Sequence, residues 1–353
     1  MCIRDRPCGG EHLSDINSQI ENSITEIRKR NGSISNFNKD KISNAIFKAL
    51  EATNKPDKEL ATELTSGVLN RLIEHGFSAE YAPSVEDIQD LVESTLIDQG
   101  HSDIARTYIL YRHERRKIRD EKMRILNTKT LDSVAKAFDT NCLRVLASRY
   151  LFRDNKNEII EKPGELFERV AVLVTISDML RDNKLFTRDG NISQDVDEAT
   201  QYLTKLDDFN FKFKIGNYYL NKWHFRCIIN CYVDLAKQGK MKIPFKELLT
   251  MIASKELDNY ADRISEYYEL MVSQDFLPNS PTMMNAGGRL GQLSACFVLG
   301  MPDDMTGIMK STSDAALIFK SGGGVGINYS DLREEGEIVA SSSGVASGPV
   351  SFM

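Results

Sequence analysis

One cysteine, Cys296, stands in an apolar run, SACFVLGMP, between two segments rich in turn-forming residues. The upstream segment is PNSPTMMNAGG, from Pro278 to Gly288, and the downstream segment is SGGGVGIN, from Ser321 to Asn328. The apolar neighbours of the thiol predict a buried strand that ends at Gly300 and Pro302. A lone cysteine in such a strand is more often a packing residue than a reactive group. The segments around Cys296 therefore decide its role.

The remaining cysteines do not form a recognisable metal or disulfide pattern. They are too sparse for a disulfide scaffold, and no C-x-x-C pair occurs. Cys227 and Cys231 would share a helix face with each other and with His224. A structural zinc site needs about four ligands. We therefore expect no metal, two small buried side chains, His224 near the surface, and Cys142 in the core.

A second candidate site lies near the N-terminus, in EIRKRNGSISNF. Lys29, Arg30 and the dipeptide Asn31-Gly32 are typical of a hairpin turn, which would present backbone amides and two cations to a phosphate. The alternative is a solvated basic turn without a ligand. The residue types alone leave both interpretations open.

Mostly helical elements surround these segments. Apolar residues at helical spacing predict a helix that begins after Asn38 or Asp40, and Ser84 to Asp87 is typical of the start of another. A further helix from Ser102 carries the basic end RHERRKIR, and residues 166–180 predict a buried helix. The segment from Asp303 to Lys320 is also expected to be helical, with Asp303 as a possible cap.

The composition and charge of the chain exclude some classes of function. The 353 residues are 41% hydrophobic and 27% charged, which is typical of a globular protein of two or three domains. A formal charge of −6 argues against a nucleic-acid partner, although nucleotides can bind at local cationic clusters. No apolar run is long enough for a membrane span, and no secretory signal is recognisable. We expect a cytoplasmic enzyme.

Four motifs in order resemble the first part of the ribonucleotide reductase barrel: PNSPTMMNAG, SACFVL, SGGGVGIN and SSGVASGPVSFM. GGGVG alone is weak evidence, because glycine-rich turns occur in many folds. The run NCLRVLASRYLFRDNKNEIIEKPGELFERVA resembles the helical N-terminal region of the adenosylcobalamin-dependent class of that family. Residues 200–242 match no pattern that we can name. The glycyl-radical class fits the motifs poorly.

The N-terminal segment resembles an ATP-cone domain, in KRNG, Phe37, DKI and RTYILYRHER. In that family the cone binds ATP or dATP as a switch. Asn31 departs from the usual acidic residue, and both types support a turn. The nucleotide positions that the resemblance implies are Lys29, Arg30, Ser35, Asn36, Phe37, Asn38, Lys39, Asp40, Lys41 and Arg112.

The resemblance also implies a chemistry for Cys296. Removal of a 2′-hydroxyl as water needs protons and two electrons, which a pair of thiols supplies while it closes to a disulfide. The resemblance places Ser280, Ala295, Cys296 and Gly324 around a ribonucleotide substrate. It assigns the partner thiol and a radical-forming cysteine to positions beyond Met353, so we expect this chain alone to be inactive. For Gly322, Gly323 and Gly326 a purely conformational role is as plausible.

An acid and an arginine complete the implied sites. In the family, positions that match Asp303 and Arg333 contribute to a specificity site for a deoxynucleotide effector at a dimer interface. The alternative for Arg333 is a surface residue near Glu334 and Glu335. The resemblance further implies adenosylcobalamin as radical source, a thioredoxin-like electron donor, and a homodimer when the chain is complete.

The expected fold class is α/β, with a mainly helical cone, a helical domain, and the opening strands of a ten-stranded α/β barrel. We expect a disordered or artefactual segment at residues 1–25, the ATP-cone at 26–119, the helical domain at 120–275, and a truncated barrel at 276–353. The alternative function is a non-catalytic module that binds ATP or dATP and regulates another protein.

Overall fold

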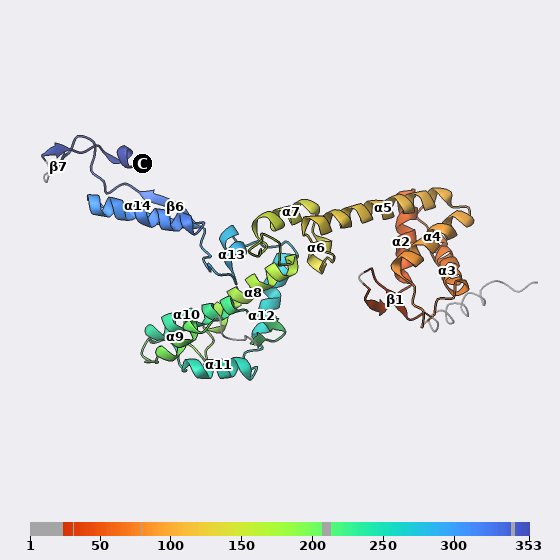
Figure 1. Cartoon of the computed structure of the whole chain (residues 1–353), viewed down its shortest axis with the longest axis horizontal. Coiled ribbons are helices and arrows are strands. Elements are labelled where there is room, and N and C mark those ends of the chain that lie inside the picture. Colours follow the sequence, from red (N-terminus) through yellow and green to blue (C-terminus); the bar gives the residue numbers. More distant parts are fainter. Residues whose placement is uncertain (1–23, 31, 79, 207–212, 340–342) are drawn as a thin grey trace, which may run out of the picture. The chain divides into compact units, whose positions relative to one another are not determined.

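The computed structural model describes residues 24–353, except residues 31, 79, 207–212 and 340–342 (Figure 1). The chain divides into two compact units, Met1–Arg124 and Ile125–Met353. Most of the expected N-terminal segment, residues 1–23, lies outside the described residues, as does Asn31. No helix of the described part combines the length and the apolar character that a membrane span requires.

The first unit contains one hairpin and a helical core. β1 (Glu26–Arg28) pairs antiparallel with β2 (Ile34–Asn36). The helices are α2 (Asp40–Ala52), α3 (Lys58–Glu74), α4 (Val85–Asp98) and α5 (Ser102–Ile125). Their apolar faces form one buried cluster. The expected helix starts are confirmed, because α2 begins at Asp40 and a capping box of Ser84 and Asp87 opens α4.

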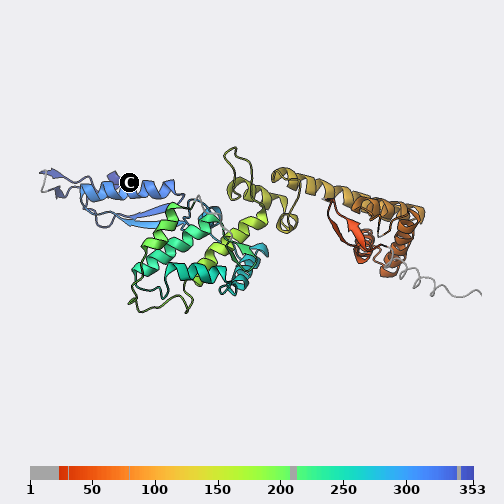
Figure 2. The ribbon, with the colours of Figure 1, turned by 60° about the horizontal axis from the view of Figure 1, so that its bottom comes forward.

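The second unit begins with a helical domain around α8 (Pro163–Met179), shown in Figure 2. Pro163 opens α8 at a position where its missing N–H costs no hydrogen bond. Buried side chains occur on every face of this helix, which confirms the buried helix predicted for residues 166–180. The other elements are α6 (Ser133–Ala137), α7 (Thr140–Arg149), α9 (Asp197–Thr204), β3 (Lys214–Ile215), β4 (Tyr218–Tyr219), α10 (Lys222–Lys237), α11 (Phe245–Ala253), α12 (Tyr260–Val272) and α13 (Ser280–Asn285).

The stretch that matched no pattern in the sequence is part of this core. Phe213 stacks on Phe225 with ring centroids 5.4 Å apart, and Phe225 contacts Phe245 of α11. Tyr232 also packs against Phe245, with centroids 5.0 Å apart. Aromatic pairs of this kind stabilise beyond their buried area. Residues around 213–232 therefore hold α10 and α11 together.

A strand–helix–strand segment follows the helical domain. β5 (Cys296–Gly300) and β6 (Gly324–Asn328) are parallel, and α14 (Met305–Lys320) connects them. The register pairs Cys296 with Gly324 and Gly300 with Asn328. The chain continues through β7 (Ile338–Val339), β8 (Gly344–Val345) and η1 (Pro349–Phe352). The expected class, mixed α/β but mostly helical with a few barrel strands, is confirmed.

A buried ion pair fixes the helical domain to the turn after α13. The Arg169 guanidinium donates to Glu161 at 2.6 Å and to the carbonyl oxygen of Ala286 at 2.5 Å. It also donates to the carbonyl oxygen of Tyr150 and stacks on the ring of Phe152. Both charged side chains are less than a tenth exposed. Buried charges are tolerated only when they are paired and hydrogen-bonded in this way.

We predict that Arg169→Met destabilises the chain by about 3 to 5 kcal/mol, because Glu161 would stay buried without a partner. Urea unfolding followed by circular dichroism measures the loss. The matched control is Arg263→Met, which removes an exposed pair with Glu266 and should cost no more than about 1 kcal/mol. Equal losses in the two variants would contradict the structural role of Arg169.

Candidate functional site

Cys296 is the first residue of β5, and its side chain is exposed. Side chains alternate along a strand, so Cys296, Val298 and Gly300 lie on one face, while Phe297 and Leu299 are half-buried on the other. The expectation that Cys296 is buried is wrong for this chain. Among the described residues, helix α14 packs against this sheet and leaves the thiol face open.

Glycines leave β6 bare beside the thiol. In the parallel register, Gly324 and Gly326 lie opposite Cys296 and Val298 on the same open face. A Cβ atom built at Gly324 or Gly326 would have no neighbour closer than 3.6 Å. The Gly324 N–H donates to the carbonyl oxygen of Ala295 at 2.7 Å, which fixes the residue before the thiol. A ligand could approach the backbone closely here.

The preceding glycines have a different role. Gly322 has φ +83, a backbone conformation that other residues rarely adopt. A Cβ atom at Gly323 would lie 2.8 Å from side-chain atoms of both Ile318 and Phe297. Gly322 and Gly323 are therefore required by the connection from α14 to β6.

Ser280 begins helix α13, although its segment is rich in turn-forming residues. Asn279 caps the helix by accepting a hydrogen bond from the Thr282 N–H at 2.9 Å. The Ser280 hydroxyl is exposed, and its oxygen lies 3.0 Å from the Tyr150 hydroxyl oxygen. Both hydroxyls can donate or accept, so Ser280 has a partner but keeps hydrogen-bonding capacity for a ligand.

Two side-chain bonds connect α13 to the approach to β5. Thr282 Oγ1 donates to the carbonyl oxygen of Leu293 at 3.1 Å, and Asn285 Nδ2 donates to that of Gln292 at 2.8 Å. The segment with Ser280 and the segment with Ala295 and Cys296 are therefore held side by side.

We predict that Cys296 is the fastest-reacting thiol of the native chain, in a background in which Cys2 and Cys8 are serine. Burial raises the pKa of Cys142 and slows its reaction. The pKa of Cys231 is lowered by Cys227, but both of these thiols are partly buried in α10, whereas Cys296 is exposed to the reagent. A disulfide reagent followed by peptide mass spectrometry measures the order of labelling. Cys296→Ser should remove the fast phase. A fast phase that persists in this variant would contradict the open face.

Asp303 and Arg333 form an ion pair at the carboxyl ends of the two strands. The Arg333 guanidinium contacts the Asp303 carboxylate through Nε and Nη2, each at 2.7 Å, and both side chains are about a third exposed. The cap of α14 is Asp304, which accepts from the Gly307 N–H at 2.8 Å, so Asp303 is not the cap. The two residues are brought together, and ligands of α/β folds commonly bind at this end of the strands.

The Cys227 and Cys231 pair lies on α10 with the sulfur atoms 3.8 Å apart. The hydrogen bond between the two thiols raises the pKa of Cys227 and lowers the pKa of Cys231. His224 is 2% exposed, and its Nε2 lies 3.0 Å from the carbonyl oxygen of Arg169. The expectation of a surface His224 is therefore wrong. No cluster that could hold a metal occurs among the described residues.

Burial lowers the pKa of His224 from 6.5 to about 4. The unfolded chain therefore binds a proton as the pH falls through about 6.5, while the folded chain does not until about pH 4. We predict that acidification across this window removes about 3 kcal/mol of stability through His224. Urea titrations of the wild type and of His224→Gln at several pH values measure the difference.

The control for this prediction is His75→Gln, at an exposed histidine. His224→Gln should flatten the pH dependence of the unfolding free energy. His75→Gln should leave this pH dependence the same as in the wild type. The same pH dependence in His224→Gln and the wild type would show that His224 does not stay neutral in the fold.

The candidate phosphate residues of the first unit lie on the β1–β2 hairpin and the start of α2. Gly32 has φ +82, and its N–H donates to the carbonyl oxygen of Lys29 at 2.9 Å, which confirms a turn. Asn38 Oδ1 accepts from the Asp40 N–H at 2.8 Å. Phe37 is half-buried and packs against the core, so its ring supports the fold. Its neighbours, the other candidate positions from Ser35 to Lys41, lead directly into the N-terminus of α2, which is a favourable place for an anion.

Arg30 and Arg112 meet the same acidic face of α4. Arg30 pairs with Glu86 and donates to Gln89 at 2.9 Å. Arg112 donates to Asp90 at 2.6 Å and to Glu93 at 2.7 Å. Burial lowers the pKa of Arg112, but the two carboxylates outweigh it and raise the pKa overall. A nucleotide phosphate would have to compete with these carboxylates.

These carboxylates were not predicted from the sequence to be partners of the two arginines. The spacing of Glu86, Asp90 and Glu93, which places them on one side of a helix, could have indicated them. Such a pattern is usually a solvated face. Only the fold brings it against two cations from distant segments.

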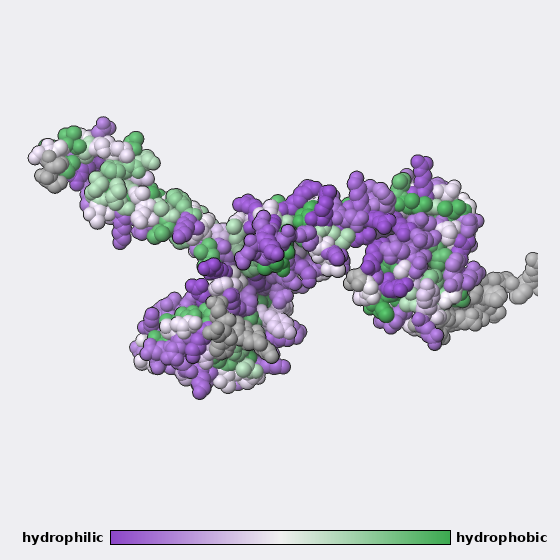
Figure 3. All heavy atoms as spheres, in the orientation of Figure 1, coloured by the Kyte–Doolittle hydropathy of each residue, from purple (hydrophilic) through white to green (hydrophobic). Residues whose placement is uncertain are grey.

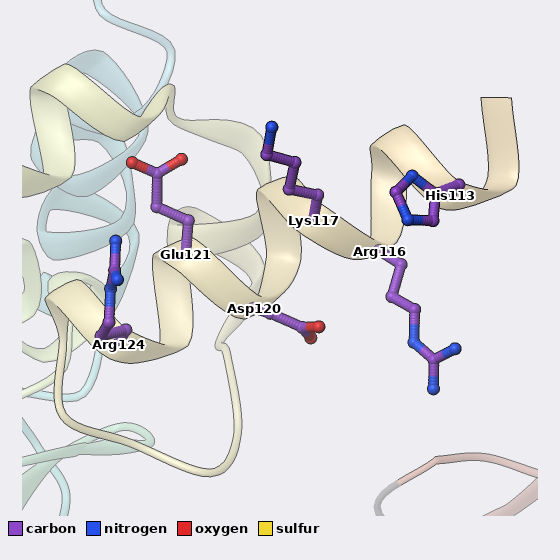
Figure 4. Close-up of a pocket in the computed structure, with 6 residues that line it drawn as sticks. All are labelled: His113, Arg116, Lys117, Asp120, Glu121 and Arg124. Carbon is purple, nitrogen blue, oxygen red and sulfur yellow. The ribbon is translucent and has the colours of Figure 1, made fainter. Parts of the chain in front are cut away.

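The basic end of α5 carries mixed charges. Lys117 and Glu121 project from one side of the helix and Arg116 and Asp120 from another (Figure 4). Cations and carboxylates that alternate in this way offset one another and are typical of a solvated helix. The charges on this surface therefore do not favour a ligand of either sign.

Family comparisons match this order of elements. Residues 25–117 match the ATP cone domain. Residues 136–211 and 246–291 match the ribonucleotide reductase all-alpha domain, and residues 294–353 match its barrel domain. The chain belongs to the ribonucleotide reductase family. The matches beyond the cone argue against the alternative of a regulatory cone module.

Individual relatives indicate which class of ribonucleotide reductase the chain is most similar to. The chain is 36% identical over 335 residues to a vitamin B12-dependent ribonucleoside-diphosphate reductase of Thermoplasma acidophilum, covering 94% of this chain and 40% of the relative. It is 28% identical over 328 residues to the enzyme of that name from Mycobacterium tuberculosis, covering 93% of this chain and 35% of the relative. A ribonucleoside-diphosphate reductase subunit alpha of Chlamydia pneumoniae is 24% identical over 401 residues, covering 94% of this chain and 38% of the relative. The chain thus spans about 40% of the length of the first of these relatives.

Proposed function

We propose that the chain contributes one redox thiol and part of the substrate site to the reduction of ribonucleoside diphosphates to deoxyribonucleotides. The observation that carries this proposal is the exposed Cys296 beside the bare backbone of Gly324. The names of the relatives support a diphosphate substrate. Ser280 would hydrogen-bond the substrate ribose or phosphate, and the backbone at Ala295 and Gly324 would lie against it.

The proposed reduction needs a second cysteine, outside the site described above, to form a disulfide with Cys296. Two thiols lose two protons and two electrons and form one S–S bond. The substrate loses its 2′-hydroxyl as water and gains hydrogen at C2′, which consumes those electrons and protons. A thioredoxin-like donor would reduce the disulfide again. None of the other described cysteines is bonded to Cys296.

The relatives are named for vitamin B12, so adenosylcobalamin is the proposed radical source. A corrin ring needs a broad surface and side chains that hold its periphery. The described residues around Cys296 offer an open face but no side chain placed to hold such a ring. These residues do not form a corrin site, and no step proposed for this chain passes through the cofactor.

The experiment is Cys296→Ser in the complete reading frame that carries these residues. We expect loss of steady-state deoxyribonucleotide formation with unchanged affinity for the ribonucleotide. Cys142→Ser, at a partly buried thiol of α7, is the matched control and should retain activity. Normal turnover by Cys296→Ser would remove the thiol from the mechanism.

We also propose that the first unit binds ATP or dATP as an allosteric switch, with the phosphates near Lys29, Arg30 and the N-terminus of α2. Asp303 and Arg333 would hold a deoxynucleotide effector, the acid through the sugar and the arginine through a phosphate. The effector would have to open their ion pair. A homodimer and a cytoplasmic location belong to the same proposal.

Two variants test the ATP site against a merely structural role for Arg30. Arg30→Ala removes a phosphate contact and should weaken ATP binding about tenfold. Glu86→Gln removes a competing carboxylate and should tighten it, since Arg30 pairs with Glu86. Isothermal titration with ATP measures both, and Arg106→Ala, at an exposed position of α5, is the control. Weaker binding in Glu86→Gln would mean that Arg30 acts through the fold.

A further inference from the structure

A pocket of about 550 Å³ in the second unit is unrelated to the sites above. Its cationic residues are Lys222 and Arg226 at the start of α10 and Arg289 in the turn after α13. Leu203 and Leu206 form the wall on the side of α9. The volume is within the range of pockets that hold small organic ligands.

The charged side chains that line this pocket are all cationic among the residues that the structure describes. Arg226 and Arg289 form no ion pair with any carboxylate in the part of the chain that the structure describes. This concentration of positive charge contrasts with the formal charge of −6 for the whole chain. Guanidinium groups bind phosphate oxygens in bidentate fashion, so the pocket is suited to an anion with several such oxygens.

An aromatic ring and an amide complete the lining. Lys222 Nζ lies 4.7 Å from the ring centroid of Trp223, and Arg226 Cζ lies 6.0 Å from it. Asn230 is two turns further along α10 and adds hydrogen-bond donors and acceptors. Cations around an indole, with an amide and an apolar wall nearby, match a ligand that has both phosphates and a flat ring.

We propose that this pocket binds a nucleoside polyphosphate, with its phosphates on Arg226 and Arg289 and its base against Trp223. The proposal does not depend on the catalytic or the cone site. The cationic and aromatic residues of α10 lie between residues 211 and 246, where the match to the all-alpha domain is interrupted. These α10 residues are therefore outside the family match, whereas Leu203, Leu206 and Arg289 are within it.

The position of the pocket would connect its ligand to the redox segment. Asn221 caps α10 and also donates from Nδ2 to the carbonyl oxygen of Gly287 at 3.0 Å. Arg289 follows in the same turn, and the chain then runs through Gln292 to Cys296. A ligand held by Arg226 and Arg289 would bridge α10 and this turn.

Trp223 is the single tryptophan of the chain, so its fluorescence reports on this pocket alone. We expect ATP to change the emission of the full 353-residue chain saturably, with half-saturation below about 1 mM. Excitation at the red edge of the indole band avoids absorption by adenine. The double variant R226Q/R289Q should weaken the affinity at least about tenfold.

The controls separate this site from the others. Arg263→Gln, at an exposed arginine of α12, should bind ATP as the wild type does. Arg30→Ala should leave the Trp223 signal unchanged even if cone binding is lost. Thermal unfolding checks that each variant is folded.

Two results would overturn the proposal. An emission that does not respond to ATP, or equal affinities in the wild type and R226Q/R289Q, would remove the site. Inorganic tripolyphosphate is the second probe and should bind more weakly than ATP, because it lacks a base. Equal affinities for the two probes would overturn the assignment to a nucleotide.

Discussion

The buried guanidinium of Arg169 is the constraint on which the second unit depends. Its charge is tolerable in the interior only while Glu161 and the carbonyl oxygen of Ala286 stay within hydrogen-bond distance. The next residue, Gly287, has φ +64, and a Cβ atom there would lie 2.6 Å from Nε2 of His224. His224 in turn contacts the carbonyl oxygen of Arg169. The turn is thus held between α8 and α10, and this fixes where the chain departs toward the reactive thiol.

Local signals predicted much of this fold. Apolar periodicity and caps located the helices that begin at Asp40 and Val85, the buried α8, and a helix between Asp303 and Lys320. These features depend on residues within one or two turns of each other, which a sequence displays directly. Motifs in their order indicated the opening strands of a barrel, whereas the parallel register that sets Gly324 opposite Cys296 became visible only in the structure. The domain boundaries and the ligand roles of the candidate residues stay predictions.

Features that depend on distant partners could not be predicted in this way. The continuous apolar run around Cys296 is typical of a strand that is buried on both faces, and it gives no sign that one face stays open here. The aromatic neighbours of His224 in the sequence gave no sign that its imidazole would be buried against the backbone carbonyl oxygen of Arg169 in α8. Likewise, Arg30 and Arg112 are visible in the sequence as cations, whereas their shared carboxylate face on α4 is created by the tertiary fold.

The strand pair of β5 and β6 has a consequence for how the protein behaves in solution. Each strand has a single hydrogen-bonded neighbour among the described residues, so one edge of each strand presents unpaired amides and carbonyls. Val298 is 83% exposed on the open face, and Phe319 of α14 is 60% exposed. Hydrophobic surface is visible over the segment with α14 and β6 (Figure 3). Apolar surface beside open strand edges favours strand addition from another molecule. Aggregation of the chain at high concentration would therefore begin at the segment that carries Cys296.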